Sequence, residues 1–361
     1  MDTSDIDRHG TFLELLASGW RPHAHVRGPV IVAVSGGGDS VALLRGLHAL
    51  HAQAAGGSCQ KLIVAHALHD LRGSEAGQPA AVDAEFVRQL AAEMGLPFVV
   101  RSLGVREAAE GGEGLEAAAR RLRYSFFRDV AEAHGARLVA TAHTADDQVE
   151  TVLHRLLRGT GLAGLAGIAA VRPLVEGIVV VRPMLAISAA SARGYLDAVG
   201  QPWREDATNR DTRYARNLLR HELLPRLTAG PYPAVGESIL RLAAQARQSH
   251  EVAEAACEAL LAAHARFEPT DSVLIDSRPL VGCPGSLLST LAATLWRQQD
   301  WPQRDMTSRH YAAVAEMLAE GAATPARLDL PGGIRAEVVA SGHLRIGPSG
   351  LTPRPDPRLH R

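Results

Sequence analysis

Residues 29–44 restrict the fold class of the chain more than any other segment does. Five β-prone apolar residues at 30–34 lead into a glycine loop, and a helical pattern with apolar side chains at 41, 44 and 47 follows at once. The glycines let backbone N–H groups approach a phosphate closely, and the start of the helix adds free donors and a positive dipole end. The sequence therefore predicts an anion site made by a strand, a loop and a helix. The predicted loop residues are Ser35, Gly36, Gly37, Gly38, Asp39 and Ser40.

The loop reads SGGGDS and differs from two common phosphate loops. No Gly-Lys-Ser/Thr follows it, which excludes a Walker loop, and its spacing is not GxGxxG. The string resembles the SGGxDS loop of the PP-loop ATP-pyrophosphatase family. That resemblance implies a site for the pyrophosphate of ATP, with Asp39 as a ligand of Mg²⁺. The alternative is a glycine turn that joins a buried strand to a helix, but the flanking serines and the aspartate favour the phosphate site.

Strands and helices alternate through the first half of the chain. Hydrophobic patterns predict further strands at 61–67, 97–103 and 137–142, and helices at 80–94, 115–134 and 145–158. This alternation predicts an α/β fold with a doubly wound parallel sheet, in which ligands bind at the carboxyl ends of the strands. We therefore expect the chemistry to gather at Ser35, His66 and His143.

The chain is expected to divide into four segments. Residues 1–200 form the catalytic domain, which begins with a helix at 11–18 and ends with an edge strand at 179–185 and a helix at 188–199. The later segments are a helical substrate domain at 201–268, a small α+β domain at 269–347 and a disordered tail at 348–361. Their predicted helices are 214–227, 235–265, 287–297 and 310–318, and a hairpin of residues 327–330 and 335–339 turns at Pro331-Gly332-Gly333.

Composition limits the class of protein. The 361 residues include 38 Lys and Arg against 39 Asp and Glu, so any contact with RNA must depend on a local patch. The three cysteines are scattered without CxxC or Cys/His metal spacing, which is typical of a reducing compartment. There is no apolar signal core and no apolar run long enough to span a membrane. We therefore expect a cytoplasmic protein with no membrane partner and no obligate protein partner.

Residues 141–151 read TAHTADDQVET and place polar groups where the fourth strand ends. His143 lies at the strand end, and Asp147, Glu150 and His154 share one face of the next helix. Acids in a first helical turn also complement the helix dipole, which is the structural alternative. The whole string resembles the HxADDQxET motif of the tRNA(Ile)-lysidine synthetase family, a PP-loop family in which the continuation RLLRGTGLAGLAGI is also typical.

The helix at 116–127 reads EAAARRLRYSFF and matches the AxxxRYxxF helix of the same family. Arg120, Arg121, Arg123 and Arg128 make it basic, while its leucine and aromatic side chains supply a buried side. One interpretation is contact with phosphate or RNA near the ATP. The other is a solvated charged face.

Residues 65–72 read AHALHDLR, where the family has HxDHGLR or HxNHxLR. The two histidines, the leucine at 71 and the arginine match. Leu68 stands in place of an acid or amide, and Asp70 stands where glycine is common. Asp70 is the candidate to replace the missing polar group. For His66, a structural role and a role in binding the nucleotide both remain open.

Residues 203–225 resemble the family's WxEDxTNxDxxYxRNxxRxxxxP segment. Arg213, Arg216 or Asn217, and Arg220 recur on one face of the predicted helix. Arginines in this arrangement are suited to RNA phosphates or to a substrate carboxylate. The alternative is a solvated arginine face with leucines packed behind it.

The resemblance is dense over residues 29–227 and implies a reaction. In that family the 2-oxo oxygen of the wobble cytidine of tRNA(Ile), in its CAU anticodon, attacks the α-phosphate of ATP. Pyrophosphate leaves, and the ε-amine of free L-lysine displaces AMP. The product, lysidine, changes the codon specificity from AUG to AUA.

The resemblance also implies roles for individual residues. The loop with Asp39 would hold pyrophosphate and Mg²⁺, and Arg120, Arg123 and His143 would contact the α-phosphate or the cytidine. The lysine ammonium has a pKa of about 10.4, so a carboxylate must place it and accept a proton. Asp147 is the first candidate for this carboxylate and Glu150 the second.

Three other classes of protein are alternatives. A PP-loop tRNA thiolase would use a cysteine or an iron–sulfur cluster, and an amidating relative such as GMP synthetase would carry an amidotransferase module. Neither feature is visible in the sequence. A non-catalytic RNA-binding descendant is compatible with the altered residues at 66–72, whereas the intact SGGGDS and DDQVET strings argue against it.

Overall fold

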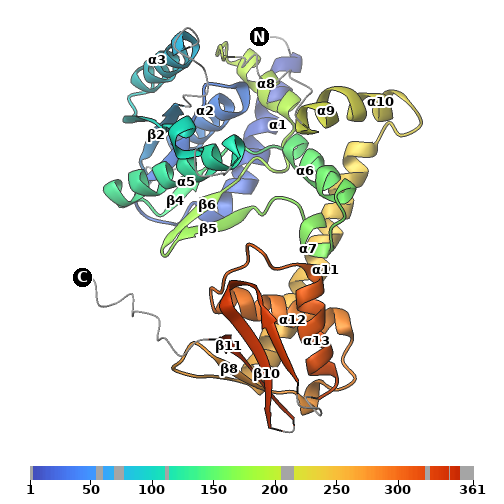
Figure 1. Cartoon of the computed structure of the whole chain (residues 1–361). Helices are drawn as coiled ribbons and strands as arrows, with labels where there is room; N and C mark the ends of the chain where they lie inside the picture. The colour runs from blue at the N-terminus through green and yellow to red at the C-terminus, as the bar shows by residue number, and fades with distance from the viewer. Residues whose placement is uncertain are drawn as a thin grey trace. The chain divides into compact units, whose positions relative to one another are not determined.

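The computed structural model describes residues 3–53, 60–68, 77–109, 114–204, 215–321, 326–340 and 342–349. The chain forms two compact units, Met1–Ala244 and Gln245–Arg361 (Figure 1). The division falls within the long helix α11, Val235–His264. The four predicted segments, with boundaries at 200, 268 and 347, stay a prediction.

The first unit is built on a six-stranded sheet in the order β3-β2-β1-β4-β6-β5. Its strands are β1 Val30–Ala33, β2 Leu62–Leu68, β3 Phe98–Ser102, β4 Leu138–Ala140, β5 Val171–Val175 and β6 Ile178–Val181. The pairs β1–β2, β1–β4, β2–β3 and β4–β6 are all parallel. The predicted α/β fold with a parallel sheet is confirmed.

The edge of this sheet differs from the prediction. An edge strand was expected at 179–185, but β6 lies inside the sheet between β4 and β5. The edge is β5, which runs antiparallel to β6. Pro173 interrupts the β-prone pattern of β5 in the sequence, and proline, which has no N–H to donate, is tolerated on an edge strand.

Helices connect these strands, and every helix predicted for this unit is present. They are α1 Thr3–Trp20, a 3-10 turn Arg21–His23, α2 Gly38–Gln53, α3 Gly77–Glu93, α4 Val105–Ala109, α5 Leu115–His134, α6 Ala145–Leu157, α7 Leu162–Leu165, α8 Ala189–Ala198, α9 Ala215–Leu218, a π-helical turn Leu219–Leu223 and α10 Leu224–Ala229. Within the described ranges, none of the helices combines the length and apolar character needed to cross a membrane.

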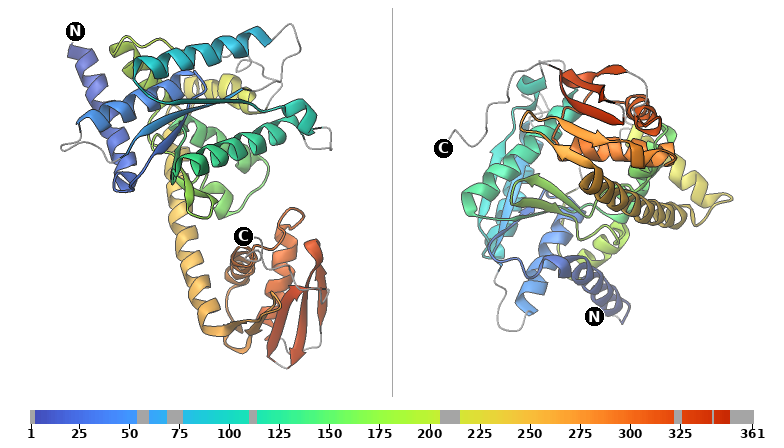
Figure 2. Two further views of the ribbon diagram at one scale, coloured as in Figure 1. Left: turned by 90° about the vertical axis from the view of Figure 1, so that its left-hand side faces the viewer. Right: turned by 90° about the horizontal axis from the view of Figure 1, so that it is seen from below.

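Both faces of the six-stranded sheet are buried, because successive side chains of a strand point to opposite faces. Val30 and Val32 of β1 belong to a core formed with α1, α2, α3 and α8, whereas Ile31 belongs to a core formed with α5 (Figure 2). The apolar run that opens the chain's key motif is therefore a central strand, and the loop after it lies at the carboxyl edge of the sheet.

The second unit consists of an antiparallel sheet, α12, α13 and the C-terminal part of α11, whose Cys257 and Leu261 belong to the same core. The sheet has the order β7-β8-β11-β10-β9. Its elements are β7 Ala265–Phe267, β8 Val273–Asp276, a 3-10 turn Arg278–Leu280, α12 Gly285–Gln298, α13 Ser308–Ala319, β9 Arg327–Leu330, a 3-10 turn Pro331–Gly333, β10 Ile334–Ala340 and β11 His343–Pro348. The predicted hairpin is confirmed as β9–β10, whereas β7, β8 and β11 were not predicted. Of the tail predicted at 348–361, residues 350–361 lie outside the described residues.

Two glycines of α1 should respond to alanine with opposite signs. A Cβ on Gly19 would overlap the carbonyl oxygen of Pro183, whereas a Cβ on Gly10 would meet nothing within 4 Å. We expect Gly19→Ala to lower the free energy of unfolding by about 1–3 kcal/mol through overpacking. Gly10→Ala should raise it by about 0.5–1 kcal/mol through helix propensity. Urea unfolding of the two variants measures both effects, and equal shifts would contradict the close approach of α1 to residue 183.

Candidate active site

The SGGGDS loop is closed by hydrogen bonds between its own serines. The Ser35 N–H donates to Ser40 Oγ at 3.1 Å, and Ser40 Oγ donates to the Gly37 carbonyl at 2.9 Å. The Gly37 N–H donates to Ser35 Oγ at 3.3 Å. Val41 N–H makes the first helical bond, to Gly37 O at 3.0 Å, so the amides at 38–40 precede the helical ladder. These amides are placed for an anion.

Residues that follow α8 cover this loop. Gly36 has φ 95°, which favours glycine, and its carbonyl accepts from the Arg204 N–H at 2.9 Å. A Cβ on Gly38 would lie 3.4 Å from Trp203 Cδ1, which is an ordinary van der Waals distance. Arg204 Nε also donates to Asp83 Oδ1 at 2.9 Å. Gly36 is therefore needed for the backbone shape of the loop, and Trp203 packs against Gly38 at ordinary contact distance.

Asp39 carries a buried carboxylate oxygen, Oδ1, that has no hydrogen-bond partner. Burial, followed by the charge of Asp147, raises the pKa of Asp39 from 3.8 to about 6, although Arg193 and Arg220 oppose the shift. An oxygen in this state fits a cation ligand, and Mg²⁺ is commonly bound by one or two carboxylates together with phosphate oxygens and water. Within the described residues, no group of three or more His, Cys, Asp or Glu side chains is arranged to hold a metal. Asp39 would therefore share the ion with the nucleotide.

The two predicted histidines differ in their surroundings. His66 is buried, and its Nδ1 donates to the Val34 carbonyl at 2.7 Å, directly before the loop. This hydrogen bond holds the backbone just before the loop. A contact between His66 and a nucleotide stays a prediction. His143 Nδ1 lies 3.0 Å from Thr141 Oγ1. Burial, followed by the charge of Arg182, lowers the pKa of His143 to about 4, so its imidazole is neutral at pH 7.

The predicted carboxylates of α6 meet Arg220 from the π-helical turn. Asp147 Oδ2 accepts from the Thr144 N–H at 2.9 Å in a capping box, and Asp147 Oδ1 accepts from Arg220 Nη2 at 3.1 Å. Glu150 is buried and accepts from Arg220 Nε. Burial raises the pKa of Glu150, although Arg220 opposes this. Arg220 was predicted to contact a phosphate or a carboxylate of the substrate, and in the structure it binds the two carboxylates predicted for lysine.

Removing Arg220 should therefore cost more stability than removing an exposed arginine. Arg220→Met leaves Glu150, whose side chain is 7% exposed, without its cation. Arg241→Met breaks an ion pair with Glu237 in which both side chains are more than half exposed. We expect a loss of about 2–4 kcal/mol for the first variant and less than about 1 kcal/mol for the second. Equal losses in urea unfolding would show that the Arg220 pair is solvated.

The arginines of α5 lie beside the same strand ends. Arg120 stacks over the Tyr124 ring at 4.9 Å from its centroid, and burial lowers the pKa of Arg123. Arg216 lies 3.7 Å from Glu116 in an exposed pair, and Asn217 belongs to α9. Arg213, His69, Asp70, Leu71 and Arg72 lie outside the described residues.

Sequence reasoning missed Arg193 and Arg172. Arg193, on α8, reaches the loop, with its Cγ 3.6 Å from the position of a Cβ on Gly38. Arg172, on β5, lies over the Tyr124 ring at 4.5 Å. Neither belongs to a recognised motif, although each lies on an element that borders the carboxyl edge of the sheet.

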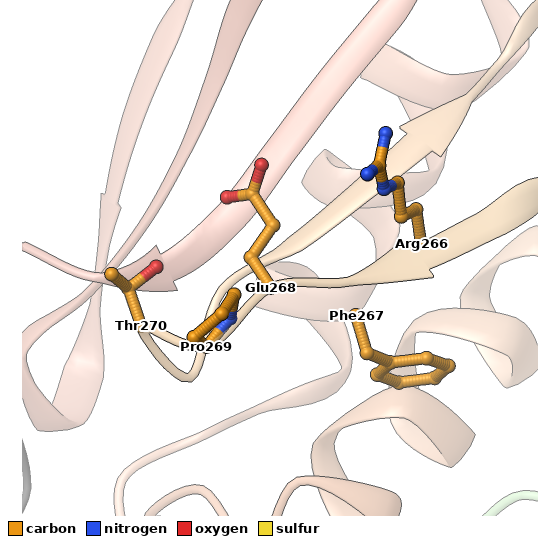
Figure 3. A pocket seen from close by; sticks show the side chains of 5 residues that line it. All are labelled: Arg266, Phe267, Glu268, Pro269 and Thr270. Carbon is orange, nitrogen blue, oxygen red and sulfur yellow. The ribbon is translucent and has the colours of Figure 1, made fainter.

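A hollow in the second unit is lined by Arg266, Phe267, Glu268, Pro269 and Thr270 (Figure 3). Its one acidic side chain already accepts a hydrogen bond at 3.2 Å from Arg345. All predicted site residues belong to the first unit, so this hollow is not part of the candidate site.

Known proteins resemble the chain in sequence and in structure. The PP-loop domain family matches residues 11–227. The tRNA(Ile)-lysidine synthase of Rhodopirellula baltica is 40% identical over 267 residues, which cover 70% of this chain and 66% of that protein. The synthase of Thermus thermophilus is 43% identical over 240 residues, covering 66% and 43%. The U34-tRNA thiolase NcsA of Methanococcus maripaludis shares the fold, with a TM-score of 0.52 at 14% identity, covering 65% of this chain and 78% of that one.

The chain spans only part of the length of the tRNA(Ile)-lysidine synthases that it matches. It spans 66% of the R. baltica protein, 45% of a synthase from Solibacter usitatus that is 47% identical over 219 residues, and 43% of the T. thermophilus protein. Residues 11–227, which the family model matches, contain all of the site residues described above.

Proposed function

The chain belongs to the PP-loop domain family, so we propose that it uses ATP to join L-lysine to the wobble cytidine of tRNA(Ile) with a CAU anticodon. The observation that carries the proposal is the buried, unpartnered oxygen of Asp39, which lies within electrostatic reach of Asp147 and Arg220. An ATP-metal site and an amine site would then be neighbours. The relatives named tRNA(Ile)-lysidine synthase support this choice of substrates.

The glycine loop would receive the triphosphate. The amides at 38–40 lie at the start of α2, where N–H groups and the helix dipole favour an anion. Mg²⁺, when bound at Asp39, would neutralise charge on the departing pyrophosphate. The exposed guanidinium of Arg193 adds a positive charge beside the loop.

Adenylation of the base would take place beside His143. The cytidine oxygen would attack the α-phosphate, a step that depends mainly on positioning and on charge stabilisation. Arg120 and Arg123 supply positive charge near His143, and the low pKa of His143, about 4, keeps its imidazole neutral. A neutral imidazole can orient the base through a hydrogen bond without repelling these guanidinium groups.

Transfer of lysine would use the carboxylates of α6. Asp147 and Glu150 already bind one cationic side chain, Arg220, which supports a second cationic ligand at this position. The ammonium must lose a proton before its nitrogen can attack the adenylated base. Burial raises the pKa of Glu150, which makes it a better proton acceptor than an exposed glutamate.

Incubation with radiolabelled lysine, ATP and a tRNA bearing a CAU anticodon tests the proposal. We expect the label to enter the RNA, with release of one AMP and one pyrophosphate for each lysine. A tRNA with a different anticodon is the control. Release of AMP that does not depend on lysine would indicate another acceptor and would contradict the proposal.

A further inference from the structure

Four arginines surround Tyr124 and His143 on the β5 side of the site. Arg120 and Arg123 come from α5, Arg172 comes from β5, and Arg182 follows β6. The guanidinium carbons of Arg120 and Arg172 lie 4.9 and 4.5 Å from the centroid of the Tyr124 ring. Although its burial opposes this, the charges of Arg120 and Arg182 lower the pKa of the Tyr124 hydroxyl.

In the described part of the chain, this cluster has no carboxylate in direct contact, although Glu116 acts on Arg123 electrostatically. Among the described residues, none of the four arginines has a carboxylate within ion-pair distance, although salt bridges are common elsewhere in the chain. Arg182 is 4% exposed and donates Nη1 to the Ala169 carbonyl at 2.6 Å, but its Nε has no partner. The Nε of Arg172 is also buried without a partner. Arg182 is buried, Arg123 and Arg172 are half-buried and Arg120 is exposed. Cations withdrawn from water without a paired carboxylate are costly, so the cluster is suited to an anionic ligand.

The register of β5 puts this cluster at the carboxyl edge of the sheet. Because β5 is antiparallel, its first residue, Val171, lies opposite Val181, the last residue of β6. The Val181 carbonyl accepts from the Thr141 N–H at 3.0 Å, just before His143. Arg172 therefore lies at the same edge of the sheet as His143, on the second strand beyond β4 and on the side away from β1.

The strand order separates this cluster from the loop that would hold the pyrophosphate. β5 is three strand positions from β1, which corresponds to about 14 Å at a strand spacing of about 4.8 Å. Positive charge also continues beyond the cluster, because Arg155 and Arg216 are both within electrostatic reach of the α5 arginines. A row of cations suits a polyanion better than a single ion.

The geometry points to a phosphodiester-binding subsite in which Arg172 and Arg120, positioned by Arg182, hold the RNA backbone next to the base that reacts beside His143. This inference rests on the proposed function and specifies where the substrate RNA is held. Arg172 is half-buried and would contact the phosphate. Arg182 is a positioning residue, because its hydrogen bond to the Ala169 carbonyl fixes it behind the cluster.

The test compares Arg172→Met with Arg137→Met in the full chain. Arg137 is an exposed arginine before β4, at the opposite edge of the sheet. Binding of an anticodon stem-loop RNA with CAU is measured at several salt concentrations. We expect Arg172→Met to weaken binding roughly tenfold and to reduce the slope of log affinity against log salt by about 0.7, the value for one single-strand phosphate contact. Arg137→Met should change neither quantity, and Arg172→Lys should restore the slope.

The readouts separate this inference from the proposed function. Unchanged RNA affinity and salt slope in Arg172→Met, in a chain that still labels tRNA with lysine, would overturn the subsite and leave the function intact. A rise in the KM for ATP with unchanged RNA affinity would assign the cluster to the nucleotide and also overturn it. A wild-type chain that binds the RNA with the expected slopes but transfers no lysine would support the subsite and contradict the function.

Discussion

Asp39→Asn is expected to abolish lysine transfer and, in the same protein, to make the ligand-free fold more stable. Asparagine keeps the shape of the side chain but supplies no charge for a metal ion. Because charge stabilisation at the departing pyrophosphate depends on that ion, we expect the rate to fall by about 10³-fold or more. Transfer of radiolabelled lysine and release of pyrophosphate measure the loss.

The gain in stability follows from the pKa of Asp39. Its value of about 6 in the folded chain, against 3.8 ordinarily, means that the ionised carboxylate opposes folding at pH 7. The difference corresponds to about 2–3 kcal/mol, which Asp39→Asn would recover in part. Urea unfolding at pH 7 without nucleotide measures this gain. An Asp39→Asn variant that is less stable than the wild type would contradict an unpaired Asp39.

The sign of the pH dependence provides a second check. Between about pH 4 and about pH 6 the folded chain binds more protons at Asp39 than the unfolded chain does, so acidification favours folding through this group. His143 acts in the opposite direction, because its pKa of about 4 lies below the ordinary 6.5 and its buried imidazole must become charged as the pH falls. Asp39→Asn should therefore lose stability more steeply than the wild type on acidification from pH 6.5 to pH 4, and adding His143→Gln should remove that excess.

The parts of the fold that sequence predicted share one property, an uninterrupted local pattern. β1, β2 and β4 are largely apolar runs because both of their faces are covered, and α5 ends at a glycine with φ 66°. β5 was missed because Pro173 breaks its pattern. β7 and β8 were missed because each is three or four residues long and gains its partners only from the tertiary fold.

The candidate site also contains residues that the sequence could place and residues that it could not. The loop at 35–40, His143 and the acids of α6 could be placed because each lies at the end of a predictable strand or in the first turns of the helix that follows. The pairing of Arg220 with Asp147 and Glu150 could not be predicted. It depends on a π-helical turn, and no local sequence pattern indicates such a turn. Arg172 was missed because it lies on β5, whose strand pattern is broken by Pro173.

Asp147→Asn is expected to block the lysine step while leaving adenylation of the base largely intact. The amide oxygen of asparagine can still accept from the Thr144 N–H, so the cap of α6 is kept, whereas the charge that faces Arg220 is lost. Without that charge the ammonium of lysine is placed less well and gives up its proton less readily. We expect lysine transfer to fall by about 10²–10³-fold. ATP–pyrophosphate exchange in the presence of tRNA should remain within about threefold of the wild type, because the exchange needs no amine.

Asp146→Asn is the matched control for this prediction. Asp146 lies one residue away in the same helical turn, and its carboxylate accepts from the Ala189 N–H at 2.7 Å instead of facing Arg220. It should leave the ratio of transfer to exchange unchanged. Raising the pH should rescue Asp147→Asn in particular, because the neutral fraction of lysine's amine rises about tenfold for each pH unit below its pKa of about 10.4. If transfer and exchange fell together in Asp147→Asn, with no rescue at high pH, Asp147 would act on the adenylation step through its charge near Asp39 and not on the amine.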